Sequence, residues 1–198
     1  MSKGKALIGI GILYIVLSLG IVLIHVYHDF RAKENSEQAL NSLMQEEQMQ
    51  SRGGLLSPER EMAVVSVGDY EYIGVLSIPV LELELPVLSE WDYSNLEMAP
   101  CRYSGTAYKG NFVVAAHNYL SHFGKLARLS MGDRVTFRDN EGNIFCYEVI
   151  EKENLGPTEV EEMVDAEYNL TLFTCTAEGT ERLTVRCNKT TEISGEGN

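Results

Sequence analysis

The stretch "LTLFTCTAEGTERLTVRC", residues 170–187, places a cysteine and two arginines in what reads as a β-hairpin. A two-residue turn at Glu178-Gly179 fits this pattern, because glycine tolerates the positive φ angle that tight hairpin turns require. In that register Cys175 lies directly opposite Arg182, and opposed residues on one face have Cβ atoms about 4.5–5.5 Å apart. The hairpin therefore predicts a guanidinium beside a thiol.

A cation beside a thiol gives the pair a definite chemistry. It favours the thiolate, which is the nucleophilic form of cysteine, and it can stabilise the oxyanion of a tetrahedral intermediate. Arg186 lies on the same face as Arg182 but about 13 Å further along the strand. Arg182 is therefore the favoured partner of Cys175, and Arg186 is the alternative.

A thiol nucleophile also needs a group that carries protons, most often histidine. His25 and His28 lie at the end of an apolar N-terminal stretch, whereas His117 ends the apolar run "NFVVAA" and His122 follows five residues later. A buried strand delivers its last side chain to the rim of a sheet. His117 is therefore the favoured acid/base, and His122 is the alternative, expected at the surface or in a groove.

The composition excludes other classes of function. The net charge of −13 and the pI of about 4.7 argue against nucleic-acid binding, which needs clustered Lys and Arg. The other three cysteines, Cys101, Cys146 and Cys187, form no C-x-x-C pair, so redox and zinc-ribbon signatures are missing. We expect them at core or edge positions, with a disulfide among them left open.

An apolar stretch near the N-terminus predicts a membrane anchor. "ALIGIGILYIVLSLGIVLIHVY", residues 6–27, holds no Asp, Glu, Lys or Arg, and about 20 apolar residues cross a bilayer core as a helix. A buried core helix is the alternative. Basic residues flank both ends, but the short, purely basic N-terminal tip favours a cytoplasmic N-terminus. The bulk of the chain is then extracytoplasmic.

The pattern along the chain predicts four parts. Residues 1–30 form the tip and anchor, 31–69 a polar, partly helical stalk without a core of its own, 70–192 the catalytic domain and 193–198 a flexible tail. Short apolar or alternating runs bounded by Gly, Asn or Asp predict strands at "EYIGVLSIP", "LELELPV", "NFVVAA", "RVTFRD" and "IFCYEVIEKE". With short helices at "SNLEMAP" and "HFGKLARLSMGD", these strands predict a mainly β domain that closes into a barrel.

Several of these segments together resemble one protein family. "TLFTC" resembles the TLxTC signature of sortases, "GNFVVAAHN" their histidine strand and "RLTVRC" their arginine strand. "YIGVLSIPVLELELPV" resembles their first two strands, so the likeness covers residues 71–188 in the right order. It implies an eight-stranded sortase barrel after one transmembrane helix. It also implies Cys175 as nucleophile, His117 as general acid/base, Arg182 as stabiliser and Thr174 as a contact of substrate or oxyanion.

The resemblance further implies an activity. Sortases are membrane-anchored cysteine transpeptidases of Gram-positive bacteria, so the barrel is expected outside a single-pass anchor in the cell membrane. They cleave an LPxTG-like C-terminal sorting motif of surface proteins or pilins through a thioester. An amine from a peptidoglycan precursor or a pilin lysine then takes the acyl group. A hydrolytic cysteine peptidase on the same fold and an inactive anchored peptide-binding module are the alternatives.

Some features depart from the family pattern or stay open. Only six residues separate Cys175 from Arg182, which trims a groove loop, and "LLSPERE" lacks the aromatic residue of a lid motif. With no C-terminal span, these features disfavour a typical lidded class C pilus sortase. No cofactor is required by the chemistry. Calcium at the acidic run 158–167 is not favoured over a solvated face, and Tyr103, Tyr108 and Tyr119 either line the groove or pack in the barrel.

Overall fold

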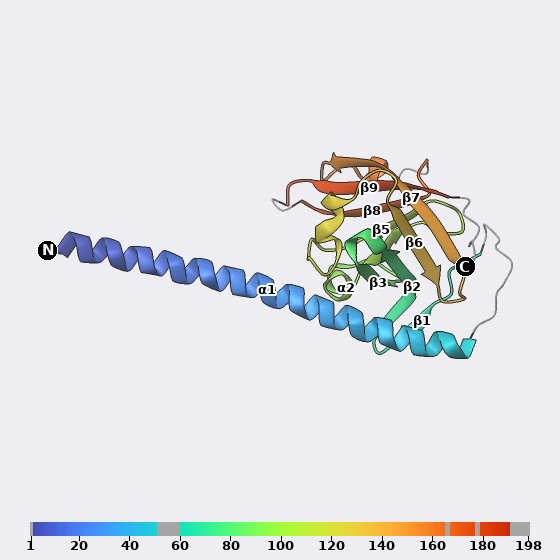
Figure 1. The fold of residues 1–198 in the computed structure, drawn as a ribbon, viewed down its shortest axis with the longest axis horizontal. Coiled ribbons are helices and arrows are strands. Elements are labelled where there is room, and N and C mark those ends of the chain that lie inside the picture. The colour runs from blue at the N-terminus through green and yellow to red at the C-terminus, as the bar shows by residue number, and fades with distance from the viewer. Residues whose placement is uncertain (1, 51–59, 165–166, 177–178, 191–198) are drawn as a thin grey trace.

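The computed structural model describes residues 2–50, 60–164, 167–176 and 179–190. The turn residue Glu178, the glycine pair at 53–54 that was expected to end the stalk, and the tail at 193–198 lie outside the described residues. Two parts are visible in Figure 1, a β-barrel and a long helix that projects from it.

Eight of the described strands close into a barrel, which confirms the predicted fold. Their order around the barrel is β2-β3-β4-β5-β8-β9-β7-β6, and β6 pairs back with β2. A further short strand, β1 (Val65–Val67), pairs with the start of β2. The barrel strands are β2 (Tyr70–Ile78), β3 (Leu83–Leu88), β4 (Cys101–Ser104), β5 (Phe112–Ala115), β6 (Arg134–Asp139), β7 (Ile144–Leu155), β8 (Leu170–Cys175) and β9 (Arg182–Lys189).

The strands around the functional site are buried on both faces. In β5, Phe112 and Val114 pack in the barrel interior, whereas Val113 and Ala115 belong to a second cluster on its outer side. This alternation follows the two-residue period of a strand. It explains why "NFVVAA" reads as a continuous apolar run rather than as an alternating one. The interior cluster includes Ile73, Leu76, Ile78, Val87, Phe123, Leu126, Val135, Phe137, Tyr147, Leu172 and Val185.

Helix α1 (Ser2–Gln50) covers part of the second cluster. The described side chains up to His28 are exposed or nearly so, but Ala32, Ser36, Ala39 and Leu43 are buried, at the spacing of one helix face. They pack toward β3, β1 and α2 (Tyr93–Met98). The sequence predicted a partly helical stalk at 31–69; the structure continues α1 into this segment as far as Gln50 and docks it on the barrel.

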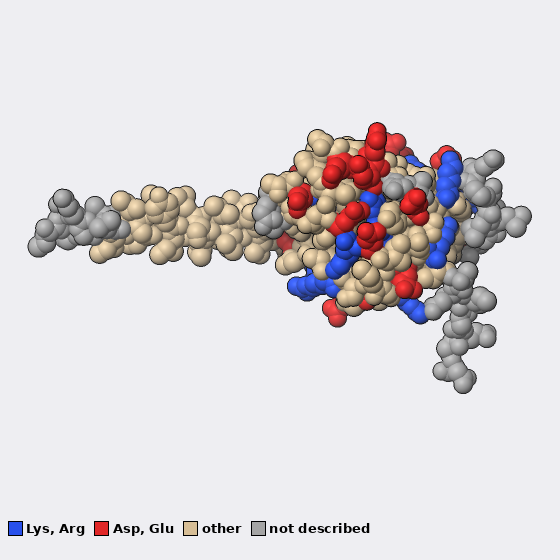
Figure 2. Space-filling model, turned by 90° about the horizontal axis from the view of Figure 1, so that it is seen from above, with Lys and Arg blue, Asp and Glu red and all other residues tan. Residues whose placement is uncertain are grey.

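The free part of α1 is a candidate membrane span. Among the described residues, α1 is the helix that is long and apolar enough to cross a bilayer. Its most apolar stretch has a mean hydropathy of 2.4, and none of that stretch is buried against the rest of the protein. Figure 2 shows its described surface bare of charged side chains, whereas the barrel face in view carries many Asp and Glu side chains.

The remaining short elements connect the strands. They are the 3-10 helices η1 (Pro79–Leu81) and η2 (Phe123–Arg128), and helix α3 (Val160–Met163) within the acidic run. The predicted helix at 94–100 corresponds to α2, and the one at 122–133 corresponds to η2. Strands β1 and β4 were not predicted. β4 is four residues long, and its pairing with β3 is a single residue pair, Leu88 with Cys101.

Candidate active site

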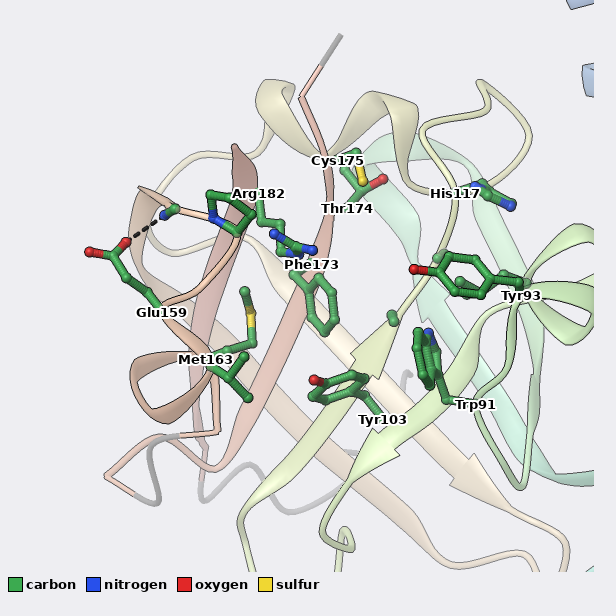
Figure 3. Close-up of a pocket in the computed structure, with 16 residues that line it drawn as sticks. Trp91, Tyr93, Tyr103, His117, Glu159, Met163, Phe173, Thr174, Cys175 and Arg182 are labelled. Carbon is green, nitrogen blue, oxygen red and sulfur yellow. Dashed lines mark hydrogen bonds between the residues drawn. The ribbon is translucent and has the colours of Figure 1, made fainter. Parts of the chain in front are cut away.

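Three neighbouring strands bring the predicted residues together. Strands β5 and β8 are parallel, with Ala115 opposite Phe173. His117 and Cys175 each follow two residues later, so they leave the same end of adjacent strands. On the other side of β8, Arg182 is the direct partner of Cys175. The predicted hairpin register is confirmed, and Cys175 lies between a histidine and an arginine, as Figure 3 shows.

Cys175 differs from the other three cysteines in its exposure. It is exposed, whereas Cys101 and Cys187 are buried, Cys146 is half-buried, and all four are free thiols. Burial raises the pKa of both Cys101 and Cys187 to about 12, which keeps these thiols protonated and unreactive. Their core positions confirm the prediction, and Cys175 is the exposed thiol available for chemistry.

His117 occupies a partly desolvated position on the cavity that Cys175 also lines. Burial lowers the pKa of its imidazole, and the nearby Glu97 carboxylate opposes that effect. The ring of Tyr119 packs against it, with 4.8 Å between ring centroids. Among the described residues no hydrogen bond joins His117 to Cys175. A neutral imidazole at this place can accept a proton at neutral pH.

His122, the alternative acid/base, lies elsewhere. It is completely buried, and its Nε2 lies 3.2 Å from the hydroxyl of Ser36 on α1. The expectation that it lies at the surface or in a groove is therefore wrong. The reason is that α1 covers this loop, which a reading of 31–69 as a separate stalk could not anticipate.

Arg186, the alternative cation, is also buried away from the thiol. Its guanidinium pairs with Glu153 at 2.8 Å, and it donates to Thr171 Oγ1 and to the carbonyl of Met163, each at 3.1 Å. A further hydrogen bond goes to the carbonyl of Glu162. Arg186 therefore ties β9 to the end of α3, whereas Arg182 lines the cavity with Cys175.

A cavity of about 170 Å³ opens beside Cys175. One wall is aromatic: Tyr103 packs edge-on against Phe173 with ring centroids 5.1 Å apart, and Trp91 packs against Tyr103 at 5.5 Å. Thr174 is 2% exposed, and its Oγ1 has no hydrogen-bond partner among the described residues. The lining residues labelled in Figure 3 are Trp91, Tyr93, Tyr103, His117, Glu159, Met163, Phe173, Thr174, Cys175 and Arg182.

Several lining residues were not identified from the sequence. Trp91 and Tyr93 flank Asp92, which caps α2 by accepting a hydrogen bond from the backbone N–H of Asn95 at 2.7 Å. This cap fixes both aromatic residues at the cavity mouth. The signal was present in "EWDYSN", which holds the chain's single tryptophan beside a helix-capping aspartate. Met163 and Glu159 come from the loop that contains α3.

The three tyrosines considered as groove residues have three different places. Tyr103 lines the cavity, as one of its two interpretations held. Tyr108 lies in the barrel core and donates its hydroxyl to the Asp139 carboxylate. Tyr119 does not line this cavity; its ring packs at a tilt against His117.

The described part of the acidic run lacks a cluster of metal ligands. Among the residues that the structure describes, no group of three or more His, Cys, Asp or Glu side chains is arranged to hold a metal ion. The carboxylate of Glu159 accepts a hydrogen bond from the backbone N–H of Gly156 instead, drawn as a dashed line in Figure 3. Asp165 and Ala166 of this run lie outside the described residues.

Comparison with known proteins agrees with this fold. The sortase domain model matches residues 76–190, so the chain belongs to the sortase family. It is 34% identical over 121 residues to sortase A of Bacillus anthracis, a match that covers 58% of this chain and 57% of that protein.

Solved structures of sortases share the fold. Sortase C1 of Streptococcus suis is similar with a TM-score of 0.56 and 26% identity, over 64% of this chain and 76% of that one. Sortase A of Corynebacterium diphtheriae is similar with a TM-score of 0.59 and 19% identity, over 90% of this chain and 98% of that one. Sortase C of Clostridium perfringens was solved with a C-terminal cell wall sorting motif. It is similar with a TM-score of 0.55 and 20% identity, over 78% of this chain and 91% of that one. The last two identities indicate the fold alone.

Proposed function

We propose that this chain is a cysteine transpeptidase that acts on C-terminal sorting motifs. The observation that carries the proposal is the position of Cys175, an exposed thiol between His117 and Arg182 at the ends of three adjacent strands. That arrangement supplies a nucleophile, a proton carrier and a fixed cation around one reacting carbonyl.

The reaction has two halves. The Cys175 thiolate attacks the carbonyl of the Thr–Gly-type bond in an LPxTG-like motif, and Arg182 stabilises the oxyanion that forms. The tetrahedral intermediate collapses to a Cys175 thioester, while His117 gives the leaving amine the proton that it took from the Cys175 thiol. An incoming amine then attacks the thioester, His117 takes its proton, and formation of the new amide releases the Cys175 thiolate. Thr174 contacts the substrate or the oxyanion, and no cofactor is required; calcium binding is not favoured.

The partners follow from this chemistry. The acyl donors are surface proteins or pilins with sorting signals, and the acceptor is an amine of a peptidoglycan precursor or a pilin lysine. Support for this kind of donor comes from sortase C of C. perfringens, whose structure was solved with a C-terminal cell wall sorting motif. The apolar part of α1 anchors the enzyme as a single-pass protein of a Gram-positive cell membrane, with the barrel on the outer face.

The test is a direct assay of the full chain in detergent. It is mixed with an LPxTG-type peptide library and several amines, and products are followed by mass spectrometry, with Cys175→Ala as control. A thioester at Cys175 and an amine-linked product support transpeptidation and identify the motif. Products with water alone indicate the hydrolytic peptidase, and peptide binding without any adduct indicates the binding module.

A further inference from the structure

The loop that carries His117 is held from outside the barrel by α1. We call residues 116–122, between β5 and η2, the histidine loop. The Asp29 carboxylate accepts a hydrogen bond from the backbone N–H of Ser121 at 2.9 Å. The Ser121 hydroxyl lies 3.0 Å from the same carboxylate oxygen and 3.2 Å from the carbonyl oxygen of Asp29. One turn of α1 therefore fixes the far end of the loop.

A second contact, between Ser36 and His122, is buried. The Ser36 hydroxyl lies 3.2 Å from the carbonyl oxygen of Met98, at the end of α2, and 3.2 Å from Nε2 of His122. A hydroxyl has one proton, so when it donates to the carbonyl it accepts from the ring N–H. His122 then carries its proton on Nε2, and Nδ1, which has no partner among the described residues, is the bare nitrogen. Ser36 joins α1, α2 and the histidine loop at one point.

The loop transmits this hold to His117. The ring of Tyr119 packs on both imidazoles, with centroid distances of 4.8 Å to His117 and 5.6 Å to His122. The backbone is tight, because the carbonyl of Tyr119 accepts from the N–H groups of both His122 and Gly124, at 2.9 and 2.8 Å. A displacement at His122 therefore moves the surface on which His117 rests.

From these contacts we infer that α1 is part of the catalytic apparatus, with Asp29 and Ser36 as positioning residues for His117. The inference rests on the proposed roles of His117 and Cys175. Neither Asp29 nor Ser36 lines the cavity beside Cys175, so their effect is on the placement of the proton carrier. Loss of their contacts should lower kcat more than it raises KM.

The experiment uses the full chain in lipid nanodiscs. The variants are Ser36→Ala, Asp29→Ala and the double variant. Ser42→Ala is the matched control, because Ser42 lies on the same helix and donates its hydroxyl to the carbonyl of Gln38, on the exposed side. Asp29→Asn keeps an acceptor oxygen for Ser121 and is the conservative rescue. Two readouts are taken: peptide turnover, and the imidazole signals of His117 by NMR with 13C-labelled histidine.

The expected result is a fall in kcat of about ten- to a hundredfold for the double variant, the range for a misplacement of about 1 Å, with KM within about twofold. The His117 signals should shift with it, Asp29→Asn should recover most of the activity lost in Asp29→Ala, and Ser42→Ala should match the wild type. A folded double variant with the kcat and His117 signals of Ser42→Ala would overturn the inference.

Two further outcomes are distinguished: a double variant that does not fold, and a wild-type chain that forms no thioester. If the double variant does not fold, Ser36→Ala decides, because it removes a single hydroxyl. If the wild-type chain forms no thioester with any peptide, the proposed function fails. The His117 signals still report whether α1 holds the loop.

Discussion

At the scale of single residues, Thr174 has an unusual surrounding. Its hydroxyl is buried beside Cys175 and has no partner among the described residues. An unpaired buried hydroxyl adds no stability, so Thr174→Val, which keeps the shape, should leave the free energy of unfolding unchanged or slightly higher. Because Thr174 lines the cavity, kcat/KM should fall about tenfold, the effect of one lost hydrogen bond of about 1.4 kcal/mol.

The measurements for Thr174→Val are urea unfolding and peptide turnover on the same preparation. Thr174→Ser, which keeps the hydroxyl, is the control and should retain most activity. A Val variant with full turnover would remove Thr174 from the site.

Arg186 is predicted to matter for stability rather than for the thiol. Its side chain is 1% exposed and has four partners on β7, β8 and α3. Arg186→Gln leaves those acceptors unsatisfied, so the free energy of unfolding should fall by about 3–5 kcal/mol. Arg186→Lys should recover only part of the loss, because one ammonium group cannot reproduce the planar fork of donors.

Urea unfolding at neutral pH tests the Arg186 prediction. Lys109→Gln is the matched control, since it makes the same charge change at an exposed position and should be neutral. An Arg186→Gln variant as stable as this control would mean that the buried hydrogen bonds contribute nothing net.

At this scale the sequence predicted the neighbours of a site residue correctly where local strand geometry determines them. The pairing of Cys175 with Arg182 followed from a glycine at a hairpin turn and the two-residue period of strands. Trp91 and Tyr93 could not be placed, because their position at the cavity depends on tertiary packing, in which Trp91 contacts Tyr103 on β4 and Tyr103 contacts Phe173 on β8. Arg186 and Arg182 share a strand face, and only the position of α3 separates their roles.

At the scale of elements, the docking of α1 over His122 should make the fold sensitive to acid. Burial, then the neighbouring His117, lowers the pKa of His122 to about 4, against about 6.5 for an exposed histidine. The unfolded chain therefore binds a proton that the folded chain does not. The contribution of His122 to the free energy of unfolding is fully present above pH 6.5. It is lost as the pH falls toward 4, and the loss from this one group is about 3 kcal/mol.

The free energy of urea unfolding between pH 7.5 and pH 4 measures this effect. The His117 pKa is also lowered, so its contribution has the same sign. His122→Gln keeps an N–H donor for Ser36 but cannot titrate, and its stability should fall less over this range. Parallel pH curves for the variant and the wild type would contradict the burial of a neutral imidazole under α1.

The residues on the docked face of α1 explain why the sequence did not reveal that this helix docks on the barrel. Three of the four buried residues, Ala32, Ser36 and Ala39, are small, and most of the surrounding positions are charged or polar. Small side chains let the helix approach β3 and α2 closely, but they give almost no hydrophobic periodicity. The strands of the barrel, by contrast, carry dense apolar runs, so most of them were predicted at nearly their observed positions.

At the scale of the whole molecule, two truncations should behave differently. A chain that begins at His28 loses the apolar span but keeps the docked face, and should remain folded and active without detergent. A chain that begins after Met44 exposes the outer cluster around Leu88 and Leu96. The loss of Leu43 and its neighbours should cost roughly 2–4 kcal/mol of stability.

Thermal unfolding and light scattering of the two truncated chains test this division. The longer chain should be monomeric, and the shorter one should unfold at lower temperature and associate through the uncovered surface. Equal stability and solubility of the two would show that the docked face is dispensable.

The unbroken α1 also sets a working height. Asp29, which holds the histidine loop, lies only two positions after Tyr27, where the apolar run ends, and two helical residues rise about 3 Å. With the span in a bilayer, the barrel lies at the lipid surface. It is joined to the span by a continuous helix and not by a flexible linker, so it cannot extend away from the membrane. Under the proposed function and topology, the enzyme would meet its substrates by lateral diffusion in the membrane plane. It should favour proteins whose motif emerges close to their own membrane segment over the same motif displayed on a long spacer.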